Sequence, residues 1–167
     1  MLSSISLSRL DEVCPQLSDL IKQLAERLEL EGIIMQVSCG LRSWAEQDSL
    51  FAQGRTKEGK IVTNAPGGTS WHNFALAVDV VMDDPSKPGF QADWVEAHPA
   101  WQRMITIAES LGLESGARWT KPHDGPHLQL TGKFGKSPND EVRQLFKDGG
   151  TLAVWEAAGL YASPPAS

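Results

Sequence analysis

The stretch that decides this fold is Ser70-Trp71-His72-Asn73-Phe74-Ala75-Leu76-Ala77-Val78-Asp79. Its second half is apolar, and the run from Ala75 to Met82 predicts a buried strand. The 54–70 segment that precedes it contains several glycines and lacks periodicity, which predicts a long surface loop. His72 and Asp79 therefore lie where a loop is expected to turn into a strand.

A second informative motif, Asp124-Gly125-Pro126-His127, lies far downstream. Together the two motifs supply three candidate metal ligands, His72, Asp79 and His127, and one further carboxylate, Asp124. A catalytic zinc site requires three protein ligands, an open coordination position for water and a base that takes the proton of that water. His72 and Asp79 are too far apart for two ligands on one helical turn, so a bend before the strand has to bring them together. These residues predict a zinc hydrolase in which Asp124 is the general base.

Helix and strand patterns alternate around these motifs. Apolar residues at three-and-four spacing predict a helix over residues 8–30, with Pro15 delaying or kinking its start. Further helices are predicted at 43–53, 99–111, from 137 onward and from 151, and short strands at 33–38, 113–120 and 127–130. The expected fold is α+β: a small antiparallel sheet with surrounding helices and a single zinc site in an open cleft.

Composition and charge exclude several classes of partner. The formal net charge is −6 and the basic residues are scattered, so the chain lacks the basic surface that nucleic acids select. No apolar run approaches the roughly 20 residues that a membrane span requires, so no membrane insertion is expected. Residues 1–11 have neither the basic region nor the apolar core of a secretory signal. We therefore expect a protein that is made in a cytoplasm.

The motif order resembles a known family. Ser-x-His-x6-Asp followed by Asp-x-x-His is similar to the zinc peptidases of the D-alanyl-D-alanine carboxypeptidase and L-alanyl-D-glutamate endopeptidase family, which cut bacterial cell-wall peptides. The run Gly40-Leu41-Arg42-Ser43-x-x-Glu46-Gln47-x-x-Leu50-x-Ala52-Gln53-Gly54-Arg55-Thr56 resembles most closely the L-alanyl-D-glutamate endopeptidases of phage endolysins. One position departs from the pattern: Ala75 stands where the family usually has glycine, so the loop must adjust if its φ is positive.

The resemblance implies roles for individual residues. One zinc ion per chain would be held by His72, Asp79 and His127, with Asp124 as general base. A hedgehog/D,D-peptidase-like architecture is implied as well.

Other residues near these motifs are assigned roles around the metal site. By the resemblance, Arg42 polarises the scissile carbonyl or holds the developing oxyanion, and Ser70 hydrogen-bonds the substrate or orients the ligands. Trp119 is close in sequence to the site and is expected to line a substrate groove. His123 is either a turn residue or a contact to the ligand shell or the substrate, and the sequence leaves this open.

The implied reaction is hydrolysis of the L-alanyl-D-glutamate bond of peptidoglycan stem peptides, by zinc-bound water that Asp124 activates. One alternative is a D,D-carboxypeptidase that removes terminal D-alanine. The other is a non-catalytic zinc-fold binding module, as in the hedgehog signalling domains, and the presence of Asp124 and Arg42 argues against it.

We expect residues 1–167 to form a single catalytic metallopeptidase domain, without a separate cell-wall-binding domain, and to act as a monomer. The resemblance to phage endolysins places the protein in bacteriophage lysis, with antimicrobial activity as a consequence. It would be made in the host cytoplasm without a signal peptide and would act on periplasmic peptidoglycan after release.

Overall fold

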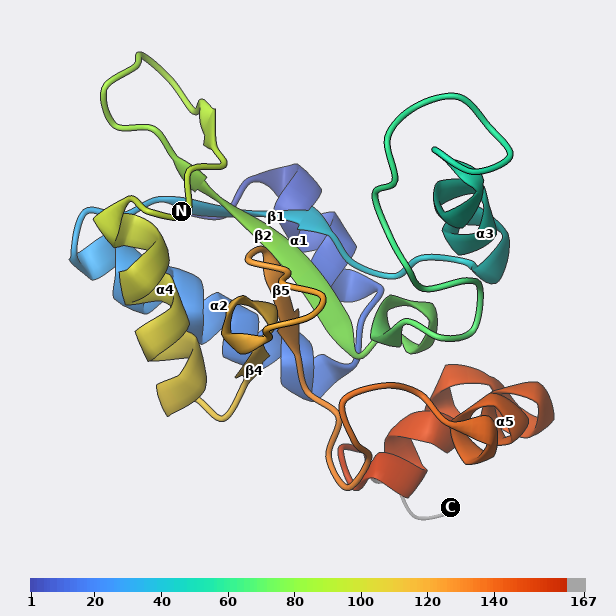
Figure 1. Ribbon diagram of the computed structural model, residues 1–167. Coiled ribbons are helices and arrows are strands. Elements are labelled where there is room, and N and C mark those ends of the chain that lie inside the picture. The colour runs from blue at the N-terminus through green and yellow to red at the C-terminus, as the bar shows by residue number, and fades with distance from the viewer. Residues whose placement is uncertain (162–167) are drawn as a thin grey trace. The chain divides into compact units, whose positions relative to one another are not determined.

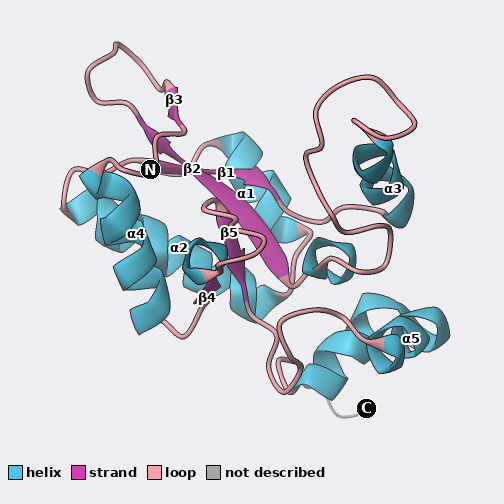
Figure 2. Cartoon of the chain, in the orientation of Figure 1, coloured by secondary structure: helices cyan, strands magenta, loops and turns pink. Residues whose placement is uncertain are grey.

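A computed structural model describes residues 1–161 of the chain (Figures 1 and 2). The chain folds into two compact units. The first comprises Met1–Gly40 and Ala77–Leu130, and the second comprises Leu41–Leu76 and the chain from Thr131 onward. None of the helices within residues 1–161 is both long and apolar enough to cross a bilayer.

The first unit is built on an antiparallel sheet with the strand order β1-β2-β5-β4, and β3 pairs with β2 as well. The strands are β1 (Met35–Cys39), β2 (Ala77–Asp83), β3 (Ala92–Asp93), β4 (Glu114–Ser115) and β5 (His127–Gln129). β2 is the longest and lies between β1 and β5 (Figure 2). The predicted buried strand is therefore the centre of the sheet, and the α+β class with a small antiparallel sheet is confirmed.

Three helices cover this sheet: α1 (Ser4–Asp11), α2 (Pro15–Leu30) and α4 (Pro99–Ser110). Helices α1 and α2 contact β1, and α2 packs against α4 (Figure 1). The predicted helix of residues 8–30 is divided in two, and the expectation that Pro15 delays the helix start is confirmed, because Pro15 occupies the first position of α2. Proline fits there, since it has no N–H to donate to the preceding turn. The apolar stripe of α2, formed by Leu17, Ile21, Leu24 and Leu28, is fully buried in the core.

The second unit contains α3 (Trp44–Ala52), the 3-10 helix η1 (Trp71–Phe74) and α5 (Asp140–Ala158). Its interior is an aromatic cluster in which Phe74 contacts the rings of Trp44, Trp71 and Phe146 edge to face. The predicted capping box is present, with the Ser43 hydroxyl accepting from the Glu46 amide and the Glu46 carboxylate accepting from the Ser43 amide.

Two segments differ from the sequence prediction. The strand expected at 113–120 is only two residues long, because the Ser115 hydroxyl accepts a hydrogen bond from the Ala117 amide and begins the 3-10 helix η2 (Gly116–Arg118). Helix α5 is kinked at Gly149 and Gly150, whose backbone angles are not helical. The separate helix predicted from Thr151 onward corresponds to the part of α5 that follows this kink.

Candidate metal and catalytic site

Two of the predicted ligands face each other on neighbouring strands of the first unit. Asp79 of β2 is in register with His127 of β5, so their side chains lie on the same face of the sheet. The Nδ1 atom of His127 lies 3.5 Å from an Asp79 carboxylate oxygen, and the His127 side chain is only 7% exposed. The fold therefore brings together two residues that are far apart in sequence.

A chain of hydrogen bonds fixes the orientation of the His127 ring. The Trp119 indole N–H and the Gln129 amide NH₂ both donate to the Glu114 carboxylate, each at 2.8 Å. A carboxylate can only accept, so the Gln129 oxygen must face His127, whose Nε2 lies 2.9 Å away. Nε2 then carries the proton, and in the neutral imidazole Nδ1 presents its lone pair to Asp79.

Two hydrogen-bond acceptors that face each other create a place for a cation. Two ligand atoms bound at about 2.0–2.2 Å to one tetrahedral zinc ion lie roughly 3.4 Å apart, which agrees with the 3.5 Å between His127 Nδ1 and Asp79. A hydrogen-bond acceptor on the far nitrogen of the histidine is also the usual support for a metal ligand. The donor set of the first unit fits zinc.

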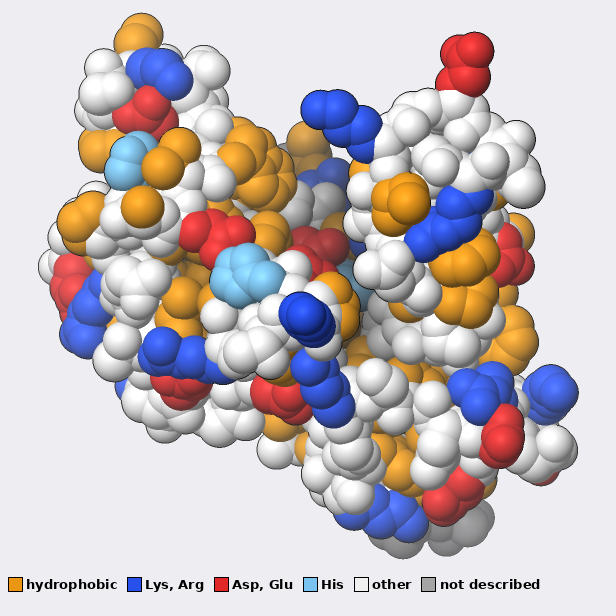
Figure 3. Space-filling view, viewed as in Figure 1, with side chains coloured by type: hydrophobic (Ala, Val, Ile, Leu, Met, Phe, Trp, Pro, Cys, Tyr) orange, Lys and Arg blue, Asp and Glu red, His pale blue; other side chains and the backbone are white. Residues whose placement is uncertain are grey.

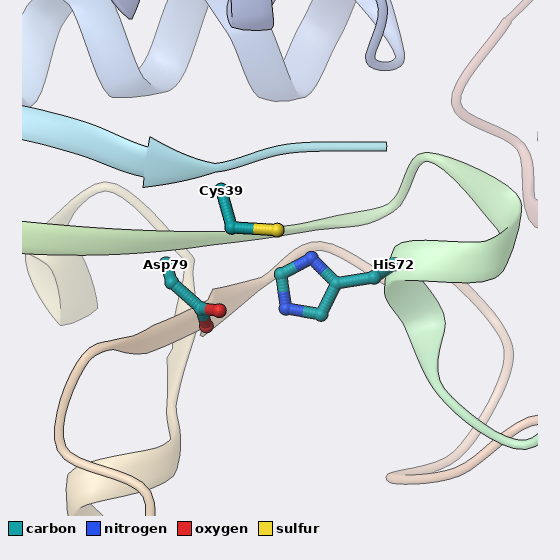
Figure 4. Close-up of side chains that lie close together, drawn as sticks. All are labelled: Cys39, His72 and Asp79. Atoms are coloured by element: carbon teal, nitrogen blue, oxygen red, sulfur yellow. The ribbon is translucent and has the colours of Figure 1, made fainter. Parts of the chain in front are cut away.

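Gln129 and Cys39 were not predicted from sequence. Gln129 follows His127 by two residues in β5, so strand periodicity alone places both side chains on one face. Cys39 is in register with Asp79 across β1 and β2, and its sulfur lies within 4.8 Å of an Asp79 carboxylate oxygen (Figure 4). A thiolate is a further zinc ligand type, so Cys39 is a candidate sulfur donor beside the Asp79 carboxylate.

Asp124 belongs to a turn that is held on both sides by backbone hydrogen bonds. The Asp124 amide donates to the Gly116 carbonyl at 3.2 Å, and the His127 amide donates to the Asp124 carbonyl at 3.2 Å. The Pro126 carbonyl accepts from the Val80 amide of β2 at 3.0 Å. These backbone hydrogen bonds fix the turn in which Asp124 lies half-buried.

The second unit carries His72, Ser70 and Arg42. His72 lies on η1 (Figure 4), and its carbonyl accepts from the Arg42 amide at 3.1 Å. The buried side-chain amide of Asn73 binds four backbone groups. It accepts from the Gly68 amide at 2.9 Å and the Ser70 amide at 3.4 Å, and it donates to the carbonyls of Arg42 at 2.9 Å and Ser43 at 3.4 Å. Asn73, which sequence reasoning did not single out, joins the three predicted residues of this unit.

The Gln47 side chain holds the Arg42 guanidinium group through a hydrogen bond. One of its guanidinium nitrogens donates to the Gln47 side-chain oxygen at 2.8 Å, and Gln47 in turn donates to the Ala65 carbonyl at 2.7 Å. Gln47 is fully buried, so it is a fixed anchor for the longer arginine side chain.

Ala75 has a positive φ, the case in which the loop was expected to adjust to its methyl group. It is the only residue other than glycine with a positive φ within the described residues, at 57°, and it ends η1. The left-handed conformation costs an L-residue roughly 1–2 kcal/mol. The methyl group of Ala75 is completely buried, so part of this cost is offset by packing.

The sequence matches the VanY family, described as D-alanyl-D-alanine carboxypeptidase, over residues 11–125. This match covers more than half of the chain. The chain belongs to the VanY family. The matched range includes Arg42, Ser70, His72, Asp79 and Asp124, and it ends two residues before His127.

Relatives and solved structures agree with this VanY-family assignment. The chain is 38% identical over 129 residues to the peptidoglycan L-alanyl-D-glutamate endopeptidase CwlK of Bacillus subtilis, covering 68% of this chain and 73% of that protein. The crystal structure of Serratia marcescens L-Ala D-Glu endopeptidase ChiX is similar with a TM-score of 0.54 and 25% identity, over 90% of this chain and 94% of ChiX. The fold of the LdcB LD-carboxypeptidase is similar too, with a TM-score of 0.54 and 18% identity over 86% of this chain and 68% of LdcB.

Proposed function

We propose that this VanY-family protein is a zinc-dependent peptidase that hydrolyses the L-alanyl-D-glutamate bond of peptidoglycan stem peptides. The bond is suggested by two similar proteins, CwlK and ChiX, both of which are L-alanyl-D-glutamate endopeptidases by name. The observation that carries the metal dependence is the acceptor nitrogen of His127, held by Gln129 and facing the Asp79 carboxylate at 3.5 Å.

We assign the zinc ligands as His72, Asp79 and His127, with one ion per chain. When bound there, zinc would act as a Lewis acid that polarises the substrate carbonyl and lowers the pKa of water to roughly 7. Gln129 and Glu114 keep the His127 ring in the tautomer that can donate a lone pair.

The proton and the developing negative charge are handled by two further residues. Asp124 takes a proton from the attacking water as the oxygen adds to the alanyl carbonyl carbon, and it gives that proton to the leaving amine of D-glutamate when the C–N bond breaks. Arg42, oriented by Gln47, offers a permanently charged donor to the carbonyl oxygen. Ser70 and Trp119 are assigned to substrate contact.

The biological setting is also a proposal. The resemblance of residues 40–56 to phage endolysins favours a role in bacteriophage lysis, in which the protein reaches peptidoglycan after release from the host cytoplasm. We propose that it acts there as a monomer with one catalytic domain, of which residues 162–167 lie outside the described structure.

Digestion of purified peptidoglycan followed by mass spectrometry of the fragments tests the reaction. The expected products carry new L-alanine C-termini and D-glutamate N-termini. Asp124→Asn should lower turnover by about 10² or more while zinc stays bound, because it removes only the base. Asp19→Asn makes the same chemical change at an exposed position of α2 and should keep full activity.

A D,D-carboxypeptidase is the second candidate, and it is favoured by the description of the family itself. It would release only terminal D-alanine from the same peptidoglycan. If the protein binds zinc but leaves the peptidoglycan undigested, it would instead be a non-catalytic binding module. Either result would contradict the proposed endopeptidase.

A further inference from the structure

A histidine–carboxylate pair outside the proposed ligand set joins two segments of the first unit. His123 Nε2 lies 2.6 Å from a Glu96 carboxylate oxygen, although the two residues are 27 positions apart. Their side chains are 51% and 35% exposed, respectively. Figure 3 shows histidine next to acidic side chains at the surface of the molecule, where such a pair is open to solvent.

The same carboxylate occupies the space beside Gly125. A Cβ atom built on Gly125 would overlap the carboxyl group of Glu96. Gly125 does not have the positive φ that nine other glycines show within the described residues, so its backbone conformation does not require glycine. The Glu96 carboxyl group instead fills the space that a side chain at this position would enter.

Glu96 therefore contacts the residues on both sides of Asp124. His123 also makes a hydrogen bond with the backbone of Trp119. The hydrogen bond with Glu96 is the main cause that raises the pKa of His123 above its ordinary value, and the negative charge of Asp124 contributes in the same direction. The His123 ring thus ties the turn to Glu96 through a 2.6 Å contact.

We propose that Glu96 and His123 are positioning residues that hold the turn of residues 121–126 so that Asp124 can transfer protons. This proposal rests on the proposed function, in which Asp124 is the general base. The turn contains no helix or strand, and backbone hydrogen bonds join Asp124 to Gly116 and His127. A catalytic group displaced by about 1 Å can lose roughly 10² in rate, so a side-chain tie to the turn has a kinetic consequence.

The kinetic test uses single and double variants on a soluble stem peptide. Glu96→Ala and His123→Ala should each lower kcat roughly 10-fold with KM changed less than about twofold, because substrate binding is not the affected step. The double variant should be no slower than the slower single variant, because the two residues act as one unit. Zinc content is measured for each protein to show that the ligands remain in place.

Gly125 provides an independent arm of this test. Gly125→Ala should lower kcat in the wild-type background, where the methyl group displaces the Glu96 carboxylate. The same substitution should have little further effect in the Glu96→Ala background, where that carboxylate is gone. His98→Ala is the matched control: it removes a comparable histidine–carboxylate bond, 2.7 Å to Asp93, that does not involve the turn, and it should leave kcat unchanged.

Nuclear magnetic resonance titration of His123 supplies a readout that does not depend on turnover. Glu96→Gln should lower the pKa of His123 toward its ordinary value, because the main cause of the raised pKa is removed. Losses that add in the double variant, an effect on KM alone, or an unchanged His123 pKa would overturn the positioning role. A wild-type protein that shows the Glu96-dependent pKa but cleaves no peptidoglycan would instead overturn the proposed function.

Discussion

The two units hold their proposed metal ligands by different means. In the first unit, Asp79 and His127 lie on hydrogen-bonded strands, and their facing positions follow from the register of β2 with β5. In the second unit, His72 lies on a single turn of 3-10 helix, and its surroundings are fixed by the buried side chain of Asn73 and by aromatic packing around Phe74. A strand ladder orients many residues at once, whereas the short turn depends on a few specific side chains.

This difference predicts which substitutions disturb the position of each proposed ligand. The backbone of a ligand on a strand is expected to keep its position when neighbouring residues change, because strand pairing holds it, so a neighbour such as Gln129 affects the orientation of the His127 ring. A ligand on a short helical turn is expected to respond to one buried amide, because few other groups satisfy the backbone there. Substitutions at five positions test this comparison, from the largest expected effect to the smallest.

Removal of a ligand from either unit should have the largest effect. Asp79→Ala and His72→Ala should each lower both the zinc content and peptidoglycan hydrolysis by more than about 100-fold, which exceeds the usual effect of altering groups around a ligand. Metal analysis after dialysis and a digestion assay measure the two quantities. Full zinc content in either variant would contradict the assignment of that ligand, and Asp19→Ala serves as the control for a lost exposed carboxylate.

Gln129→Leu should weaken zinc binding by roughly 10–100-fold while preserving the strand pairing. The substitution removes the acceptor from His127 Nε2 and leaves the ring free to change its tautomer. Competition with a chromogenic chelator measures the affinity. Unchanged affinity would show that backbone register alone is sufficient to orient the histidine of the first unit.

Asn73→Ala should destabilise the second unit by about 2 kcal/mol or more, because buried backbone groups lose their partners. The affected groups are the amide of Gly68 and the carbonyl of Arg42. Urea unfolding gives the free energy, and hydrogen exchange of residues 66–76 locates the change. Asn64→Ala removes an exposed amide that binds Arg55 and should change the free energy of unfolding by less than about 0.5 kcal/mol.

Ala75→Gly should have the smallest effect, a change of less than about 1 kcal/mol in the free energy of unfolding. Glycine relieves the left-handed backbone at φ 57°, but it also deletes a completely buried methyl group and adds freedom to the unfolded chain. Ala75→Val is the opposite test, since a β-branched residue is unfavourable in this conformation and would overfill the site. A stable valine variant would show that the turn carrying His72 adapts easily.

Much of this fold could be predicted from local patterns. The apolar run that became β2, the capping box of α3 and the proline at the start of α4 all depend on residues that are close in sequence. The errors also have local causes: Pro15 divided a periodic helix, and Ser115 ended a strand after two residues. Proline at position 15 and serine at position 115 are recognisable signals for the start of a new element. Apolar periodicity alone does not tell whether such a signal interrupts the predicted helix or strand.

By itself, the sequence determined which residues are chemically suited to the site, because histidines, aspartates and an arginine occur in a recognisable order and belong to the VanY family. Only the tertiary structure decided how they are supported. The pairing of β2 with β5 placed Asp79 opposite His127, Gln129 and Glu114 fixed the imidazole tautomer, and Glu96 reached His123 across 27 positions. Such contacts depend on strand register and on the path of the chain between elements, which no local pattern contains.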